Sequence, residues 1–193
     1  TYETEYNSGI GSNGLTSARH DIFHKKLAHE FPDSFDPNTN KEFIYSGKNS
    51  LFDKLNNETL SKLVLSPTRT YAPVIKRIFS DFKKDISGMI HCTGGGQTKI
   101  MHFIEKLHIC KNNMFDVPPL FKLIKEESGT SWREMYQVFN MGHRMEIYLK
   151  RDVASEIIKI ANSFNLDAKV IGFVEKSNVS KLTIHSPEGE LVY

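Results

Sequence analysis

A chain of 193 residues with 39% hydrophobic and 25% charged side chains is long enough to bury a core and has the composition of a folded globular protein. Its 25 basic and 23 acidic residues leave a formal net charge of +2, which is too small to indicate nucleic-acid binding. No apolar stretch approaches the roughly 20 residues that a membrane span requires, so neither nucleic acid nor a membrane is expected as a partner.

The first pattern in the chain is a loop of small residues that leads into a helix. The loop, residues 8–14, reads SGIGSNG. The apolar residues after it recur at helical spacing: Leu15, Ala18, Ile22, Phe23 and Leu27. Residues 32–54 are polar, with Asp, Asn, Pro and Gly scattered through them, which predicts a long surface excursion. We therefore expect residues 1–54 to comprise the loop, the helix and the excursion, and residues 55–193 to comprise the domain core.

The rest of the chain contains helical and strand patterns in turn. Helical spacing predicts helices at residues 56–65, 70–86, 97–107, 117–129, 130–139 and 151–164. Alternation or short apolar runs predict strands at 89–93, 143–150, 168–176 and 180–185, and the last two are expected to form an antiparallel hairpin. The predicted fold class is therefore α+β, with a mixed sheet of four or five strands covered by helices.

Three consecutive glycines, Gly94, Gly95 and Gly96, lie between a predicted strand and a predicted helix. Backbone N–H groups that converge at such a junction bind anions, and the helix dipole favours negative charge there. The segment CTGGGQTK is neither a Walker A loop, because it has no Gly-Lys pair, nor a GxGxxG motif. The residues themselves leave two interpretations open, a turn that needs positive φ and a phosphate-binding loop.

Two further loops have a similar form. The SGIGSNG loop precedes a helix, and its alternative interpretation is an ordinary N-terminus capped by Ser12 or Asn13. The loop FNMG, residues 139–142, joins a helix to a strand and could be a helix C-cap with Gly142 in the left-handed conformation. Three such loops in one chain favour a polyanionic ligand.

Other candidate sites are weaker. His20 and His24 are four residues apart on a predicted helix, but no third ligand has suitable spacing, so a solvated helix surface is favoured over a metal site. Cys92 and Cys110 lie in apolar surroundings without metal-ligand spacing, which favours buried thiols in a reducing, cytoplasmic compartment. No GxSxG elbow selects a nucleophilic serine. We therefore assign no metal ligand and no catalytic residue.

Five segments, SGIGSNG, LSPTRTYAPVI, GMIHCTGGG, VPPLF and EMYQVFNMGHRM, in this order resemble the C-terminal half of aminoimidazole ribonucleotide synthetase, also called phosphoribosylformylglycinamidine cyclo-ligase. The resemblance implies a partly ferredoxin-like α+β domain of a cytoplasmic, homodimeric ligase of de novo purine biosynthesis. The family reaction closes formylglycinamidine ribonucleotide to aminoimidazole ribonucleotide and converts ATP to ADP and phosphate. The resemblance also implies that the N-terminal domain, with the dimer interface and most ATP and Mg²⁺ contacts, lies outside these 193 residues, so the chain by itself is expected to be inactive.

By resemblance, a cleft for the nucleotide substrate and ATP is lined by Ser12, Asn13, Gly14, Arg69, Thr93, Gly94, Gly95, Gly96, Phe139, Asn140, Met141 and Gly142. Arg69 is a candidate phosphate contact, because a guanidinium can bind two oxygens of an oxyanion at once. The chain departs from the family pattern at Gly11, where relatives have a histidine. It departs again at His143 and Arg144, where relatives have Ile-Gly; these two side chains could replace the missing charge.

Two alternatives to the cyclo-ligase interpretation remain. The first is another ATP-using member of the superfamily, of the formylglycinamide ribonucleotide amidotransferase, selenophosphate synthetase or thiamine phosphate kinase type, which share the two-domain plan. The segment EMYQVFNMG favours the cyclo-ligase, whereas the departure at Gly11 keeps this alternative open. The second is a non-catalytic module that binds a nucleotide phosphate.

Overall fold

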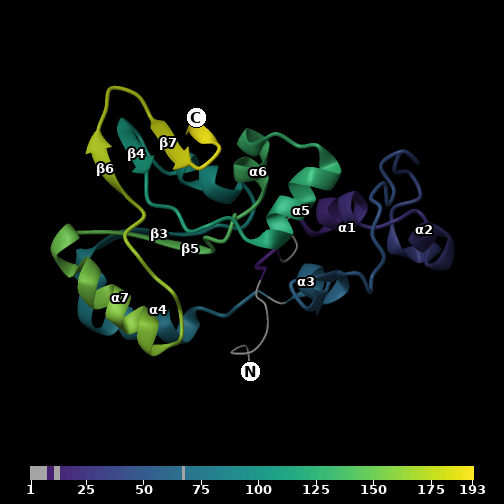
Figure 1. Ribbon diagram of the computed structural model, residues 1–193. Helices are drawn as coiled ribbons and strands as arrows, with labels where there is room; N and C mark the ends of the chain where they lie inside the picture. The colour runs from purple at the N-terminus through teal and green to yellow at the C-terminus, as the bar shows by residue number, and fades with distance from the viewer. Residues whose placement is uncertain (1–7, 11–13, 67) are drawn as a thin grey trace.

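The strands of this protein form three separate sheets. The computed structural model describes residues 8–10, 14–66 and 68–193. In these ranges two sheets have two strands each and one has four, and helices lie around them (Figure 1). The predicted α+β class is confirmed, and the largest sheet is mixed as expected. Within the same ranges, none of the helices has both the length and the apolar character that crossing a membrane demands.

Strand β4 (Leu107–Lys111) lies inside the four-stranded sheet, whose order is β6-β4-β7-β8. It pairs antiparallel with β6 (Gly172–Lys176) and parallel with β7 (Lys181–Ser186), and β7 pairs antiparallel with β8 (Gly189–Val192). The hairpin predicted from the last two strand patterns is therefore wrong, because β4 lies between them. At Gly172 an added Cβ would lie 1.9 Å from the Cys110 carbonyl oxygen, so this approach of β6 to β4 depends on glycine.

The helix predicted at residues 97–107 is also wrong. A 3₁₀ helix, η3 (Gly96–His102), occupies its first part, and the chain then enters β4. The helical spacing that suggested one face included Phe103, but this side chain is 67% exposed, whereas Ile109 in β4 is buried. The 3₁₀ helix ends at His102, and from Leu107 on the backbone pairs with β6 and β7, so the helical pattern is not continued to residue 107.

Strands β3 (Ile86–His91) and β5 (Met145–Leu149) form an antiparallel pair and confirm the strand patterns at 89–93 and 143–150. Their Cα register aligns Met89 with Ile147. The end of β3 leads directly into the three glycines, so this pair sets the position of the glycine loop.

Two helices cover one side of this strand pair. They are α4 (Ala72–Phe82) and α7 (Ala154–Ser163), which lie side by side in Figure 1. Short 3₁₀ turns adjoin them, η2 (Lys83–Asp85) and η4 (Arg151–Val153). Apolar side chains of the helices and strands form one core cluster: Val74, Ile75, Ile78, Ile86, Ile147, Leu149 and Ile157. Both helices were predicted, because each has an apolar face at helical spacing.

The helix predicted after the SGIGSNG loop is divided in two. Helix α1 (Leu15–Ile22) ends before Phe23, and α2 (Lys26–Glu30) follows. The backbone N–H of His24 donates to the Asn49 carbonyl oxygen at 2.9 Å, and Phe23 also bridges to Asn49. Because this pairing uses backbone groups that an unbroken helix would need, the helix stops here.

The predicted surface excursion is anchored to α1. Most of its residues are exposed, and η1 (Pro32–Ser34) begins it, but Ile44 and Tyr45 are buried. After the excursion, a short hairpin with two residues in each strand replaces the first part of the helix predicted at 56–65. Its strands and the helix that follows are β1 (Lys54–Leu55), β2 (Glu58–Thr59) and α3 (Leu60–Leu65). The cause is a turn at Asn56 and Asn57, which both have positive φ.

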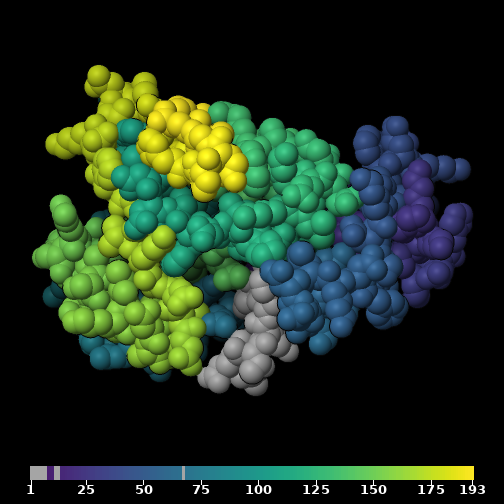
Figure 2. Space-filling model, in the orientation of Figure 1, coloured from purple at the N-terminus to yellow at the C-terminus, as the bar shows by residue number. Residues whose placement is uncertain are grey.

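Helices α5 (Pro119–Ser128) and α6 (Trp132–Val138) confirm the two predicted helices in this region. Gly129, with φ of 68°, ends α5, and the Ser131 hydroxyl caps α6 by accepting from the Glu134 N–H at 3.3 Å. Helix α5 packs against α1 and contributes Leu120, Phe121 and Ile124 to the main core. In the space-filling view, α5 and α6 lie between residues 14–55 at one end and α7 with β6 at the other (Figure 2).

A buried ion pair joins the four-stranded sheet to the β3–β5 pair. Lys111 at the end of β4 and Glu146 in β5 are 1% and 6% exposed, and their Nζ and Oε1 atoms are 2.5 Å apart. Lys111 also donates to the backbone and side-chain oxygens of Gln97, at 2.8 and 3.1 Å. Tyr148 donates to the second carboxylate oxygen of Glu146 at 2.6 Å. The ammonium thus has three acceptors, as a buried charge requires.

We predict that Lys111→Met lowers the free energy of unfolding by about 3–5 kcal/mol, because it leaves the Glu146 carboxylate buried and unpaired. Urea denaturation measures this change. The double variant Lys111→Met with Glu146→Met should lose less than the sum of the two single variants, since neither charge then remains without its partner. As a control, Lys150→Met breaks the exposed pair with Asp85 and should leave unfolding nearly unchanged. Equal effects of Lys111→Met and Lys150→Met would contradict the prediction.

Candidate functional site

The loops predicted to bind phosphate meet at one place. An added Cβ at Gly96 would lie 2.5 Å from the Phe139 carbonyl oxygen, so the glycine loop contacts the FNMG backbone. An added Cβ at Gly14 would lie 2.6 Å from the Phe139 ring, and the Asn140 side-chain amide donates to the Ser8 carbonyl oxygen at 3.0 Å. Ser12 and Asn13 lie outside the described residues. The structure therefore brings together three loops that are far apart in the sequence.

Gln97 connects these loops to the buried ion pair. Its side-chain amide donates to the carbonyl oxygens of Asn140 and His143, at 2.6 and 3.1 Å, and its own oxygen accepts from Lys111. Gln97 is 1% exposed, so the polar contacts are made in a region from which water is excluded. The position of the FNMG loop thus depends on a side chain just after the three glycines.

Sequence reasoning missed Gln97, Lys111, Glu146 and Tyr148 as support for the site. A signal existed for two of them: Lys111 follows the apolar residues Ile109 and Cys110 in β4, and Glu146 lies in the otherwise apolar β5. A charged residue in a strand usually faces solvent, so neither signal by itself predicts burial. The burial of both residues follows from the contact between the end of β4 and β5, which only the structure shows.

The glycine loop combines a tight turn with a fixed cation. Gly94, Gly95 and Gly96 have φ of 22°, 88° and 46°, so the turn interpretation is confirmed for the backbone. The Lys99 ammonium donates to the His91 carbonyl oxygen at 3.1 Å and to the Thr93 hydroxyl at 3.2 Å. The Lys99 ammonium is therefore held beside the glycines, an arrangement that suits an anion.

The FNMG loop is held by its own side chains. Phe139 and Met141 are 4% and 1% exposed and belong to the main core, so their side chains anchor the loop to that core. The Asn140 side-chain oxygen accepts from the Gly142 N–H at 2.8 Å. Gly142 has positive φ as expected, but α6 ends earlier, at Val138, so Gly142 is not its C-cap. Likewise, the N-cap residue of α1 is Gly14 and neither Ser12 nor Asn13.

Burial keeps two histidines near the N-terminal and FNMG loops neutral. His143 is 5% exposed, its Nε2 accepts from the Phe115 N–H at 2.9 Å, and desolvation with the nearby Lys111 lowers its pKa to about 3. The expectation that His143 supplies charge is therefore wrong. His20, expected on a solvated surface, is 8% exposed and accepts from the Tyr45 N–H; burial and Arg19 lower its pKa.

Arg69 lies apart from the glycines but close to their strand. Its guanidinium donates to the Asn165 carbonyl oxygen at 3.2 Å, and its charge acts on Tyr71. The Tyr71 ring stands edge-on to His91, with 5.8 Å between ring centroids, at the end of β3. Both thiols, Cys92 and Cys110, are free and buried, and desolvation raises the pKa of each, so neither is an activated nucleophile.

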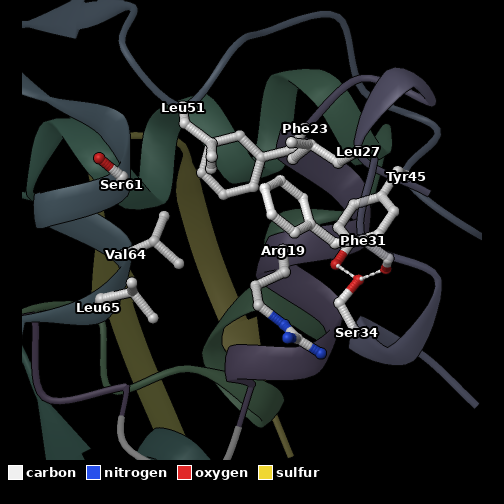
Figure 3. Close-up of a pocket in the computed structure, with 10 residues that line it drawn as sticks. All are labelled: Arg19, Phe23, Leu27, Phe31, Ser34, Tyr45, Leu51, Ser61, Val64 and Leu65. Carbon is white, nitrogen blue, oxygen red and sulfur yellow. Dashed lines mark hydrogen bonds between the residues drawn. The ribbon is translucent and has the colours of Figure 1, made fainter. Parts of the chain in front are cut away.

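A cavity of about 180 Å³ lies between α1, α2 and α3 and contains none of the predicted site residues (Figure 3). Its lining residues are Arg19, Phe23, Leu27, Phe31, Ser34, Tyr45, Leu51, Ser61, Val64 and Leu65. Figure 3 shows Arg19 between the aromatic side chains and those of α3, and Ser34 bonded to Tyr45. In the parts of the chain that the structure covers, no group of three or more His, Cys, Asp or Glu side chains gathers in a way that could hold a metal ion.

Comparison with known proteins is consistent with this geometry. Residues 3–185 match the family described as AIR synthase related protein, C-terminal domain. Phosphoribosylformylglycinamidine cyclo-ligases of Methanocaldococcus jannaschii and Lawsonia intracellularis are both 31% identical, over 88% and 89% of this chain and 43% and 44% of theirs. The chain thus spans less than half the length of these relatives. The crystal structure of E. coli HypE, a hydrogenase maturation protein, shares the fold, with a TM-score of 0.50 at 17% identity over 95% of this chain and 46% of that one.

We predict that His143 makes the fold sensitive to acid. Its lowered pKa means that the folded state does not bind the proton that the unfolded chain binds below pH 6.5. Its stabilising contribution is therefore complete above pH 6.5 and declines as the pH falls toward 3, by about 2 kcal/mol between pH 7 and pH 5.

Urea unfolding of the chain and of His143→Gln at pH 7 and pH 5 measures this effect. Glutamine can still accept from the Phe115 N–H, so the variant should fold and lose less stability on acidification. His24→Gln is the matched control, because His24 is exposed and should leave the pH dependence as it is. The prediction fails if the chain and His143→Gln lose equal stability.

Proposed function

The chain belongs to the family of AIR synthase related proteins, as a C-terminal domain, and from this premise we propose that it is the C-terminal domain of an ATP-dependent phosphoribosylformylglycinamidine cyclo-ligase. In this proposal the whole protein converts formylglycinamidine ribonucleotide to aminoimidazole ribonucleotide, ADP and phosphate in de novo purine biosynthesis. The relatives that bear the cyclo-ligase name at 31% identity support it. The reaction is proposed for a protein that also contains the part of those relatives that this chain does not span.

The observation that carries the proposal is the meeting of the three loops. Gly14, Gly96 and Asn140 come from distant parts of the sequence, and each contributes to one set of backbone and side-chain contacts. Both the nucleotide substrate and ATP carry phosphate groups. Loops with positive φ and a lysine beside them can approach such groups closely, because no Cβ blocks the backbone.

The chemistry needs a pocket that holds two phosphorylated molecules together. Transfer of the terminal phosphoryl group of ATP to the amide oxygen of the substrate makes that oxygen a good leaving group. The amidine nitrogen then attacks the same carbon, the C–O bond breaks, and phosphate leaves as the ring closes. We assign the loops the task of binding and orienting these groups, and we name no catalytic acid or base.

The residues described do not form a Mg²⁺ site by themselves, since no suitable group of carboxylates and histidines gathers among them. Mg²⁺ usually contacts one or two carboxylates together with the phosphates of its nucleotide. We propose that the metal ligands, most ATP contacts and the homodimer interface belong to the other domain. We also propose that the enzyme works in the cytoplasm.

We predict that the full-length protein forms ADP from ATP when formylglycinamidine ribonucleotide is present and not when it is absent. A coupled ADP assay with and without this substrate measures the dependence. The 193-residue chain by itself should show no cyclisation, because in this proposal half of the cleft belongs to the domain that the chain does not span. ATP turnover that depends on a different phosphoryl acceptor would contradict the proposed function.

We also predict that Lys99→Met in the full-length protein lowers kcat/KM by at least about tenfold, which corresponds to about 1.4 kcal/mol. The substitution removes the cation beside the glycines but keeps most of the side-chain volume. Lys76→Met on the exposed face of α4 is the matched control and should leave kcat/KM unchanged. Equal rates for the two variants would show that the glycine loop does not contact the reactants.

A further inference from the structure

We propose that the cavity between α1, α2 and α3 binds a small aromatic carboxylate, which pairs with the Arg19 guanidinium and places its ring in the apolar part of the cavity (Figure 3). None of the described residues that line this cavity belongs to the three-loop site. The cavity is therefore a second binding site, and it does not rest on the proposed function.

Arg19 gives an otherwise uncharged cavity a single positive charge. Phenylalanine, leucine and valine side chains make up most of the lining, and among the described lining residues Arg19 is the only charged one. The ion pairs between described residues of the chain do not include Arg19. A ligand that enters the cavity therefore meets a cation that no carboxylate of the described residues pairs with.

The Nε–H group of Arg19 is buried without a hydrogen-bond partner. Its nitrogen has almost no contact with solvent, and no acceptor among the described residues bonds to it. Buried donors in folded proteins are nearly always hydrogen-bonded, because a donor that loses water without gaining an acceptor destabilises the fold. A carboxylate supplies such an acceptor, since its two oxygens accept side by side from the Nε–H and a terminal N–H of a guanidinium.

The two hydroxyl groups near Arg19 in Figure 3 donate their hydrogens within the protein. Ser34 donates to the Phe31 carbonyl oxygen at 2.6 Å. Because a serine has one hydroxyl hydrogen, the Ser34 oxygen must accept from the Tyr45 hydroxyl, which lies 2.8 Å away. Neither hydroxyl has a hydrogen left for a ligand, so Arg19 is the donor on this side of the cavity.

Tyr45 forms a wall of the cavity that is already ordered. It is 3% exposed, its N–H donates to Nδ1 of His20 at 3.2 Å, and the two ring centroids are 4.7 Å apart. The Phe35 ring stands edge-on to Tyr45, with 6.2 Å between centroids. Burial and the charge of Arg19 lower the pKa of His20, so this histidine adds no second charge near pH 7. A ligand therefore loses little binding free energy to ordering this wall.

The size of the cavity suits a ligand with one ring. Its volume is about 180 Å³, whereas an apolar cavity of about 150 Å³ holds benzene and pockets for drug-sized ligands begin at about 300 Å³. Phe23 and Phe31 lie across the cavity from the side chains of α3 (Figure 3), and aromatic rings bind another ring in edge-on or offset contacts. Phe31 and Leu65 are 53% and 63% exposed, so the cavity opens to solvent and a ligand can enter.

The first experiment is an NMR titration of the ¹⁵N-labelled chain with phenylacetate. The Arg19 Nε–H signal, identified by its absence in Arg19→Lys, should move on binding, with a dissociation constant of about 1 mM or lower. Acetate has the charge without the ring, and phenylacetamide has the ring without the charge, so each should bind at least tenfold more weakly. Phenylacetamide that binds as tightly as phenylacetate would overturn the proposal, and so would an Arg19 signal that phenylacetate leaves unmoved.

Variants separate the charge from the shape of the cavity. Arg19→Met removes the charge and keeps most of the side-chain volume, so it should weaken phenylacetate binding at least tenfold. Arg19→Lys keeps the charge without the Nε–H group and should weaken binding less. Ser61→Leu enlarges a side chain on the α3 wall and should also weaken binding, because the leucine takes the space of the ring. Arg151→Met, at an exposed position outside the cavity, is the matched control and should bind as the parent chain does. Unchanged binding in Arg19→Met overturns the site.

Thermal unfolding of each variant shows whether a loss of binding is a loss of folding. Arg19→Met should unfold at or above the temperature of the parent chain, because it removes a buried donor that has no partner. If Arg19→Met does not fold, Ser61→Leu carries the test, and phenylacetate binding at full strength in Ser61→Leu overturns the site.

A second copy of the chain is the competing occupant of the cavity. In that case the Arg19 Nε–H signal would shift with protein concentration in the absence of phenylacetate. Such a shift would overturn the assignment to a small carboxylate, whereas a signal that is independent of protein concentration and moves with phenylacetate supports it.

Discussion

The buried ion pair between Lys111 and Glu146 is the interaction on which the arrangement of this protein depends. It links the four-stranded sheet to the β3–β5 pair, and through Gln97 it also holds the turn after the three glycines. A buried lysine ammonium has no water to accept its three hydrogen bonds, so it needs three acceptors from the protein. For Lys111 these acceptors lie in β5 and η3. Because an unpaired buried charge is costly, the two sheets and the glycine loop can adopt few other arrangements.

The candidate site builds on this constraint by separating charges according to burial. Inside, the charge of Lys111 is balanced by Glu146, and His143 is neutral because desolvation lowers its pKa. At the edge, Lys99 is partly exposed beside the glycines. An anion that reached the loops would therefore meet this lysine and the backbone groups of the glycine loop. Such an arrangement suits the proposed binding of phosphorylated reactants.

Local sequence predicted the elements whose stability is local. Helices α4, α5, α6 and α7 each have an apolar face, and the first three also have a capping or proline signal. Strands β3 and β5 follow clear strand patterns, so the existence of all six elements could be expected. Two of the failures share one cause. The hairpin of β6 with β7 and the unbroken first helix were each overridden by backbone pairing with a distant segment, at β4 or at Asn49. No local pattern records which distant strand will compete for the same N–H and C=O groups.

For the site, the sequence by itself determined the residue types of the loops and, by their small size and polarity, the prediction that they approach an anion. It also suggested the family, which the match over residues 3–185 confirms. Tertiary structure decided which loops meet, that Gln97, Lys111 and Glu146 support them, that His143 is neutral, and that Arg144 packs against Gly9. The reason is physical: loop composition depends on neighbours in sequence, whereas burial, pKa and the direction of a long side chain depend on neighbours in space.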